Sequence, residues 1–313
     1  NPTPFNPTPE YDKAVSSRTR TAATTSSARP APKGTVTDGI AKRLAHPPTS
    51  ASPRVIVLDT GLAIPRFLPD ALKGGPIEPA SGTDTDEPDE TKDGLVDPVA
   101  GHGTFIAGLI GHVAPGCRTI VHRVLATYGD TDEWRVIKRL RALQFPQPSR
   151  TLLSMSFGGY VLDEPQLLAS AVGAIQARGV TVVASAGNDA SWRPSFPAAL
   201  PGVISVGAIG PSGPAYFTNY GGWVSACAPG VEVISTFFDH FDGLLPLQPD
   251  GTDPDDFNGW AQWSGTSFSA PVLAGCLARI MMTGTSAVDA IDQLLDDPAL
   301  MRIPYLGTVV NSM

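Results

Sequence analysis

The chain has 313 residues, of which 42% are hydrophobic and 17% charged, as in a soluble globular protein that buries a sizeable core. Its 22 Lys and Arg residues against 30 Asp and Glu residues give a net charge of -8, which argues against the clustered basic surface that nucleic acids require. The longest charge-free run, residues 194–231, contains six prolines and cannot form a membrane helix. We therefore expect neither nucleic acid nor a membrane as a partner.

Pro, Thr, Ser and Ala dominate residues 1–50, and such a segment cannot form a packed core alone. We predict an N-terminal extension over residues 1–50 and one folded domain over residues 51–313. Because residue 1 is Asn rather than Met, we expect that a leader or pro-segment has been removed, or that the sequence was trimmed.

Short apolar runs alternate with helical patterns along the domain. Strands are predicted over residues 54–58, 119–125, 152–157, 180–186 and 203–208. Helices are predicted over residues 102–112, 132–143, 165–178 and 272–282. This alternation predicts an α/β fold of three α/β/α layers with a mostly parallel central sheet. In such sheets the functional crevice lies at the carboxyl ends of the strands, so residues that follow strands are the first candidates for a site.

Asp59 and His102 are two such candidates. Asp59 directly follows the apolar run 55–58 and precedes a Thr-Gly turn, although a lone Asp in this position is usually a turn or cap residue. His102 lies in the sequence Gly-His-Gly-Thr, at the first turn of a predicted apolar helix. The glycines on either side of His102 allow backbone and substrate to come close.

Ser267 and Asn188 complete the candidate set. Ser267 lies in Gly-Thr-Ser-Phe-Ser-Ala-Pro before a helical run, where a Ser is most often a helix cap but where exposed N–H groups also favour a developing anion. The tripeptide at residues 284–286 repeats Gly-Thr-Ser but lacks the Ala-Pro, and we treat it as a coincidence. Asn188 follows a predicted strand, and its amide can donate to an oxyanion.

Covalent hydrolysis of a peptide bond needs a nucleophile, a base, a group that orients the base, and donors for the oxyanion. Taken in the order Asp59, His102, Asn188 and Ser267, these residues and the short motifs around them resemble those of the subtilisin-like serine peptidases, or subtilases. The resemblance covers about residues 52–283. Further short motifs that match the family are Ser154-Met155-Ser156-Phe157-Gly158-Gly159, Phe196-Pro197-Ala198 and Ala228-Pro229-Gly230.

The resemblance implies a subtilisin-like fold and a serine endopeptidase that works through an acyl-enzyme. Ser267 would attack the scissile carbonyl, His102 would accept and return the proton, and Asp59 would orient the imidazole. Asn188 and the Ser267 backbone N–H would form the oxyanion hole. A protein or peptide substrate would lie extended along Ser156–Gly158.

The resemblance also implies a set of substrate-binding residues: Ser156, Phe157, Gly158, Ala186, Gly187, Asp189, Ser195 and Phe196. Asp189 would lie near the mouth of the first pocket, which holds the substrate residue directly before the scissile bond. If its carboxylate points inward, the pocket would favour Lys or Arg; if it points outward, the pocket would accept apolar residues. The net negative charge favours basic substrates through electrostatic steering.

Two other functions compete with an active subtilase. The first is a catalytically silent subtilase fold that binds peptides through the same groove. The second is the related sedolisin class, which uses Glu as its base, and the Gly-His-Gly-Thr sequence argues against it.

Two acidic segments interrupt the pattern: residues 84–97 with seven carboxylates and residues 239–256 with six. We predict that both are solvated insertion loops, with a cation site as the alternative. The loop that binds calcium tightly in bacterial subtilisins has no counterpart at residues 111–116. No cofactor is therefore expected to be required and no metal ligands are assigned, while a structural Ca²⁺ ion stays open.

The cysteines Cys117, Cys227 and Cys276 follow no metal-binding spacing, and we predict that they are buried apolar residues. We expect a monomer, with removal of a pro-segment as one of the alternatives for its N-terminus. The family resemblance favours an extracellular location, whereas three thiols without an obvious pairing favour the cytoplasmic alternative.

Overall fold

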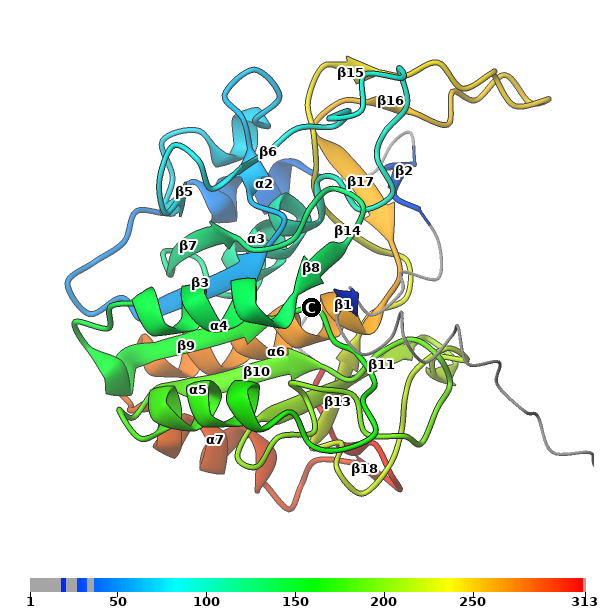
Figure 1. The fold of residues 1–313 in the computed structure, drawn as a ribbon. Helices are drawn as coiled ribbons and strands as arrows, with labels where there is room; N and C mark the ends of the chain where they lie inside the picture. Colours follow the sequence, from blue (N-terminus) through cyan, green and yellow to red (C-terminus); the bar gives the residue numbers. More distant parts are fainter. Residues whose placement is uncertain (1–17, 21–26, 33–36, 312–313) are drawn as a thin grey trace, which may run out of the picture.

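A long, mostly parallel sheet forms the centre of the computed structural model, which describes residues 18–20, 27–32 and 37–311 (Figure 1). Its strands, in spatial order, are β18 (Arg302–Ile303), β19 (Gly307–Val309), β13 (Ala226–Pro229), β11 (Ile204–Gly210), β10 (Thr181–Ser185), β9 (Thr151–Met155), β3 (Arg54–Asp59), β7 (Arg118–Arg123) and β5 (Ile77–Pro79). Neighbours from β19 to β5 are parallel, whereas β18 and the short β12 (Gly213–Pro214) pair antiparallel. The predicted sheet type is confirmed.

Helices cover both faces of this sheet (Figure 1). One face carries α4 (Glu133–Ala142) and α5 (Gln166–Gln176), and the other carries α3 (His102–Val113), α6 (Thr266–Met281), α2 (Asp38–Leu44) and α7 (Ala287–Leu295). Side chains alternate along β3 as a doubly covered strand requires. Val55 and Val57 join the core under α3 and α6, while Ile56 and Leu58 join the core under α4 and α5. The predicted α/β/α layering is confirmed.

Helix α6 begins earlier than the sequence pattern predicts. The pattern places helix only after Pro271, but α6 begins at Thr266 and runs through this proline. Pro271 has no N–H to donate to the carbonyl of Ser267 one turn earlier. That carbonyl instead accepts a hydrogen bond of 2.9 Å from the Ser156 hydroxyl. Ser267 therefore lies inside the first turn of α6 rather than before it.

Smaller sheets surround the central one. They comprise β4 (Leu62–Ala63) with β6 (Thr85–Asp86), β14 (Val233–Thr236) with β17 (Trp260–Trp263) and β2 (Arg29–Pro30), β15 (Phe241–Asp242) with β16 (Asp256–Phe257), and β1 (Arg18–Arg20) with β8 (Asp130–Asp132). Two short 3₁₀ helices, Asp70–Leu72 and Pro148–Arg150, complete the regular elements of the described chain.

The described parts of the N-terminal extension contact the domain at three places. β1 pairs with β8, β2 pairs with β17, and α2 packs on α3. At the last contact Leu44 is buried, and the Arg43 Nε donates to the carbonyl of His112 at 2.7 Å. The rest of the extension lies outside the described residues, and its predicted boundary at residue 50 stays a prediction.

The three cysteines are buried and no disulfide joins them, which confirms the prediction for Cys117, Cys227 and Cys276. Burial raises the pKa of the Cys117 thiol to about 12. Across the described residues, none of the helices is both long and apolar enough to cross a membrane.

Candidate active site

A buried hydrogen bond joins Asp59 to His102. Asp59 is the last residue of β3 and His102 is the first residue of α3. The His102 Nδ1 lies 2.7 Å from Asp59 Oδ1, and both side chains are fully buried. The backbone N–H of Thr60 donates to the same carboxylate oxygen at 2.8 Å. With Nδ1 donating to Asp59, the other ring nitrogen of His102 is left able to accept a proton.

Glycine residues let the start of α3 approach the turn after β3. A Cβ atom on Gly103 would lie 2.2 Å from the carbonyl oxygen of Gly61, so no other residue fits there. Gly101, just before the helix, has a φ of 79°, in the left-handed region that favours glycine. The Gly-His-Gly sequence thus allows the close contact that brings the imidazole to Asp59.

Two aromatic side chains enclose the imidazole of His102. The ring of Trp263 in β17 lies 5.4 Å away, edge to face, and the ring of Phe268 in α6 lies 5.3 Å away. No residue of the described chain forms a hydrogen bond with His102 Nε2, which is buried. Sequence reasoning missed both aromatic residues, because an apolar side chain beside a catalytic-type residue has the same pattern as any core residue.

Ser267 is held against the end of β9. Its hydroxyl donates to the carbonyl of Ser156 at 3.2 Å, and the Ser156 hydroxyl donates back to the carbonyl of Ser267. Both residues are buried. The structure therefore brings Ser267 and the strand-end residue Ser156 together, and it directs the Ser267 hydroxyl toward Ser156 rather than toward His102.

Thr266 fixes the orientation of the Asn188 amide. The Asn188 Oδ1 accepts from both the backbone N–H and the hydroxyl of Thr266, each at 2.9 Å. The Thr266 Oγ1 also accepts from the backbone N–H of Gly187 at 3.1 Å. With its oxygen engaged, Asn188 turns its NH₂ group the other way, to 3.5 Å from where a Cβ of Gly265 would lie. The role of Thr266 could not be recognised from the sequence, because Gly-Thr-Ser is a common tripeptide.

The predicted substrate-binding residues fall into two groups. Ser156 and Gly158 follow β9, Gly187 follows β10, and the Ser195 hydroxyl would lie 2.7 Å from a Cβ on Gly158. Phe196 pairs through its backbone with Gly159. The Ser195 hydroxyl thus lies between Gly158 and Gly187, near the carboxyl ends of β9 and β10. By contrast, the side chains of Phe157 and Ala186 are fully buried in the core, so only their backbones can face a substrate.

Asp189 lies on the surface in a small polar network. Its carboxylate accepts from the Tyr160 hydroxyl at 2.8 Å, and that hydroxyl accepts from the Asn219 amide at 2.7 Å. The guanidinium of Arg193 lies 5.2 Å from the centre of the Tyr160 ring. Partial burial and the neighbouring Asp189 carboxylate raise the pKa of Tyr160 to about 12, so the phenol remains a donor at neutral pH.

The prediction that residues 84–97 form a solvated loop is wrong. Three of its carboxylates, on Asp84, Asp86 and Asp97, are buried. Asp84 accepts from the backbone N–H of Arg123 at 2.8 Å and pairs with Arg139 at 2.9 Å. The count of acidic residues could not show that these carboxylates bond to arginines, backbone N–H groups and hydroxyls of the domain.

Asp86 lies directly behind the Asp59–His102 pair. Its Oδ2 accepts from the Thr60 hydroxyl at 2.6 Å and from the backbone N–H of Gly101 at 2.8 Å. It therefore connects the residue after Asp59 with the residue before His102. Burial raises the pKa of the Asp86 carboxyl well above its usual value, and the nearby Asp59 carboxylate adds to this effect.

Comparison with known proteins gives a consistent result. Residues 51–292 match the family model described as the subtilase family. The chain is 30% identical over 253 residues to subtilisin-like protease 3 of Pseudogymnoascus destructans and 28% identical over 219 residues to an extracellular protease of Xanthomonas campestris pv. campestris. These matches cover 76% and 63% of the chain, which spans only 55% and 36% of the length of the two relatives.

Solved structures show the same architecture. The crystal structure of a cold adapted subtilisin-like serine proteinase aligns with a TM-score of 0.61 at 24% identity. The alignment covers 83% of this chain and 88% of that one. At this identity the likeness supports the fold alone.

Substituting Asp86 tests the protonation of this buried carboxyl. Because the folded-state pKa lies above the usual value of 3.8, the folded protein keeps a proton that the unfolded chain has lost. The free energy of unfolding should therefore fall as pH rises from about 4 through the raised pKa, by up to about 1.4 kcal/mol per pH unit. Asp86→Asn should remove this decline.

Urea unfolding between pH 4 and pH 8, in a Ser267→Ala background, measures the effect. The exposed Asp163→Asn variant makes the same substitution at a solvated carboxylate and should keep the pH dependence of the parent. Equal slopes for the parent and Asp86→Asn would contradict a protonated Asp86.

Proposed function

The chain belongs to the subtilase family, and from this premise we propose that it is a serine endopeptidase whose triad is Asp59, His102 and Ser267. The observation that carries the proposal is the buried 2.7 Å contact between Asp59 and His102, with the first turn of α6 packed against the same imidazole through Phe268. A buried carboxylate that orients a histidine beside a helix-start serine provides the groups for covalent hydrolysis.

The first chemical step moves one proton and forms one bond. The Ser267 hydroxyl would turn from the Ser156 carbonyl toward His102 Nε2, give up its proton there, and attack the scissile carbonyl carbon. The carbonyl π electrons move to the oxygen, and the Asp59 carboxylate stabilises the imidazolium. Collapse of this intermediate breaks the C–N bond, and the leaving amine takes the proton from His102. Water then repeats the sequence and releases the acid from the acyl-enzyme.

The oxyanion formed in this step would be bound by Asn188 and by the Ser267 backbone N–H. Thr266 supports this assignment, because it occupies the Asn188 oxygen and so leaves the NH₂ group on the side of Gly265, the residue before α6. The N-terminal end of a helix adds free N–H groups and a favourable dipole. Preorganised donors of this kind stabilise the transition state without reorganisation.

One observation favours the alternative, a silent subtilase fold that binds peptides. The Ser267 hydroxyl donates to Ser156, and both Ser267 and His102 are fully buried. A protein with this arrangement throughout would bind an extended peptide without cutting it. The two functions differ in whether the Ser267 hydroxyl can rotate about χ1 from Ser156 toward His102. Covalent labelling of Ser267 measures this difference.

An active-site fluorophosphonate probe should label the wild-type chain at Ser267, because the phosphorus takes the place of the scissile carbonyl. The Ser267→Ala variant should not be labelled and should lose proteolysis of denatured casein. Ser286→Ala is the matched control, because it alters the second Gly-Thr-Ser word and should keep full labelling. Intact-protein mass spectrometry measures the adduct. No adduct on a folded wild-type chain would favour the silent alternative.

The pairing of the N-terminal extension with β8 suggests where an extended substrate would bind. β1 runs antiparallel to β8, with Thr19 opposite Thr131. Shortly before β8, the backbone N–H groups of Val124 and Leu125 both donate to the carbonyl of Asp59. We assign the β8 edge to substrate pairing, since an extended peptide adds to a free strand edge in the same way. The chain's own residues 18–20 would then compete with substrate.

Breaking the β1 pairing should make this edge more available. Thr19→Pro removes a backbone N–H and fixes φ, so the strand should leave β8. If the strand competes with substrate, KM should fall about threefold or more while kcat stays unchanged. Thr19→Ala keeps the backbone donor and should leave KM at the wild-type value. Fluorogenic-peptide kinetics measure both constants, and an unchanged KM for Thr19→Pro would contradict the competition.

Substrate preference should differ between the first pocket and the β8 edge. The neutral hydroxyl of Ser195 lies between Gly158 and Gly187, where the family resemblance puts the first pocket, and the Asp189 carboxylate is engaged with Tyr160 at the surface. An uncharged side chain therefore suits this pocket. The β8 edge instead carries Asp130 and Asp132, so substrate residues that lie there should be basic.

A peptide-library profile checks both statements. We expect uncharged residues directly before the cut and enrichment of Lys or Arg further toward the N-terminus. Asp132→Asn should weaken the basic preference about threefold or more while it keeps the helix cap of α4, since Asn caps as well as Asp. Asp189→Asn should leave the first-pocket profile unchanged. A strong Lys or Arg preference at the first pocket that Asp189→Asn abolishes would overturn the assignment.

A further inference from the structure

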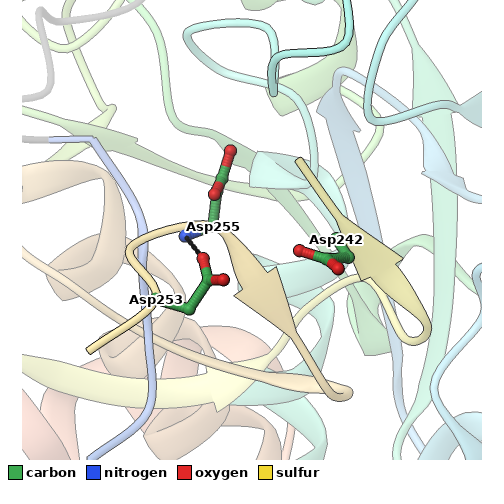
Figure 2. Close-up of side chains that lie close together, drawn as sticks. All are labelled: Asp242, Asp253 and Asp255. Atoms are coloured by element: carbon green, nitrogen blue, oxygen red, sulfur yellow. Dashed lines mark hydrogen bonds between the residues drawn. The ribbon is translucent and has the colours of Figure 1, made fainter. Parts of the chain in front are cut away.

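The second acidic segment forms a hairpin with three convergent carboxylates. β15 and β16 pair antiparallel, with Phe241 opposite Phe257. Asp242 ends β15, while Asp253 and Asp255 lie in the turn before β16. Figure 2 shows the Asp242 side chain reaching from its strand toward this turn. The hairpin thus gathers three of the six carboxylates of residues 239–256.

Asp255 is unusual for an acidic residue in a surface segment, because only 2% of it is exposed. Its Oδ2 accepts from the backbone N–H of Leu245 at 3.1 Å, but among the described residues its buried Oδ1 has no hydrogen-bond donor. Gly243 makes room for this carboxylate, since a Cβ there would lie 1.9 Å from Oδ2. A buried carboxylate oxygen without a donor is costly unless a positive charge compensates it.

No cation of the hairpin supplies that compensation. Residues 239–256 contain six carboxylates and no Lys or Arg. The Asp253 carboxylate accepts from the backbone N–H of Asp255 at 3.2 Å, which places a second negative charge beside the first. The three side chains therefore repel one another unless something binds between them.

The spacing of the oxygens fits a single metal ion. One carboxylate oxygen from each of Asp242, Asp253 and Asp255 lies within 4.8 Å of the other two. Oxygens bound to one Ca²⁺ at about 2.4 Å can be separated by up to about 4.8 Å. All three donors are hard oxygens, and the exposed side of the hairpin leaves room for water to complete the coordination.

We propose that Asp242, Asp253 and Asp255 bind one Ca²⁺ ion that closes the β15–β16 hairpin. The three carboxylates supply the charge and three or more of the ligand oxygens, and water supplies others. Phe257 connects this hairpin to the core, because its ring lies 4.6 Å from Phe237, which in turn lies 6.0 Å from Trp263. The ion therefore anchors a segment that is linked, through Phe237, to the Trp263 ring that packs on His102. This proposal does not depend on catalytic activity.

Calorimetric titration of the EDTA-treated full chain with CaCl₂ tests the proposal, in a Ser267→Ala background that prevents self-digestion. We expect one site with a Kd of about 10⁻⁴ M, as for exposed sites of few carboxylates. Thermal unfolding in excess Ca²⁺ should shift Tm upward by about 3 °C or more relative to EDTA. Mg²⁺ should bind at least about tenfold more weakly, because it requires a regular octahedral cage.

Variants separate this site from binding elsewhere. Asp242→Asn and Asp253→Asn should each weaken Ca²⁺ binding about tenfold or more. Asp255→Asn should abolish the Tm gain in Ca²⁺ while it leaves Tm in EDTA equal or higher, because it removes the buried charge. Asp250→Asn, an exposed member of the same segment, should bind like the parent. The absence of heat and of a Tm shift in the parent, or equal Kd values for Asp253→Asn and Asp250→Asn, would overturn the proposal.

Discussion

The buried hydrogen bond between Asp59 and His102 is the interaction on which the arrangement of this protein depends. A carboxylate and an imidazole that are both fully shielded from water must be held by several elements at once, since burial of an unsupported charge is costly. β3 supplies Asp59, α3 supplies His102, and Asp86 ties their neighbours together. Trp263 and Phe268 then close the imidazole off from solvent.

The parallel sheet brings the other groups to the same edge. β3, β9 and β10 are adjacent and parallel, so the residues that follow them emerge side by side. α6 begins at that edge, where Ser156 and Ser267 exchange hydrogen bonds. Pro271 contributes to this exchange, because its missing N–H leaves the Ser267 carbonyl available to Ser156. A residue that usually breaks a helix thus helps to join the helix to the sheet.

The fold and part of the site could be predicted from the sequence because they depend on local signals. Apolar runs of strand length define β3, β9 and β10, and Gly on both sides of His102 indicates a close backbone approach. Thr266, Trp263 and Asp86 could not be predicted. Their importance comes from what lies opposite them in space, 26 residues away in the chain for Asp86 and Thr60 and 78 for Thr266 and Asn188.

The two acidic segments show why composition alone cannot predict whether a carboxylate is paired with a cation of the fold. In residues 84–97, Asp84 meets Arg139 and Glu90 meets Arg123, both supplied by elements of the central fold. The β15–β16 hairpin packs Phe257 on the core, but among the described residues no ion pair joins Asp242, Asp253 or Asp255 to a Lys or Arg. Its buried Asp255 oxygen therefore needs a partner from solution. The same surplus of carboxylates thus has two physical outcomes, which are set by the cations that the fold brings to each segment.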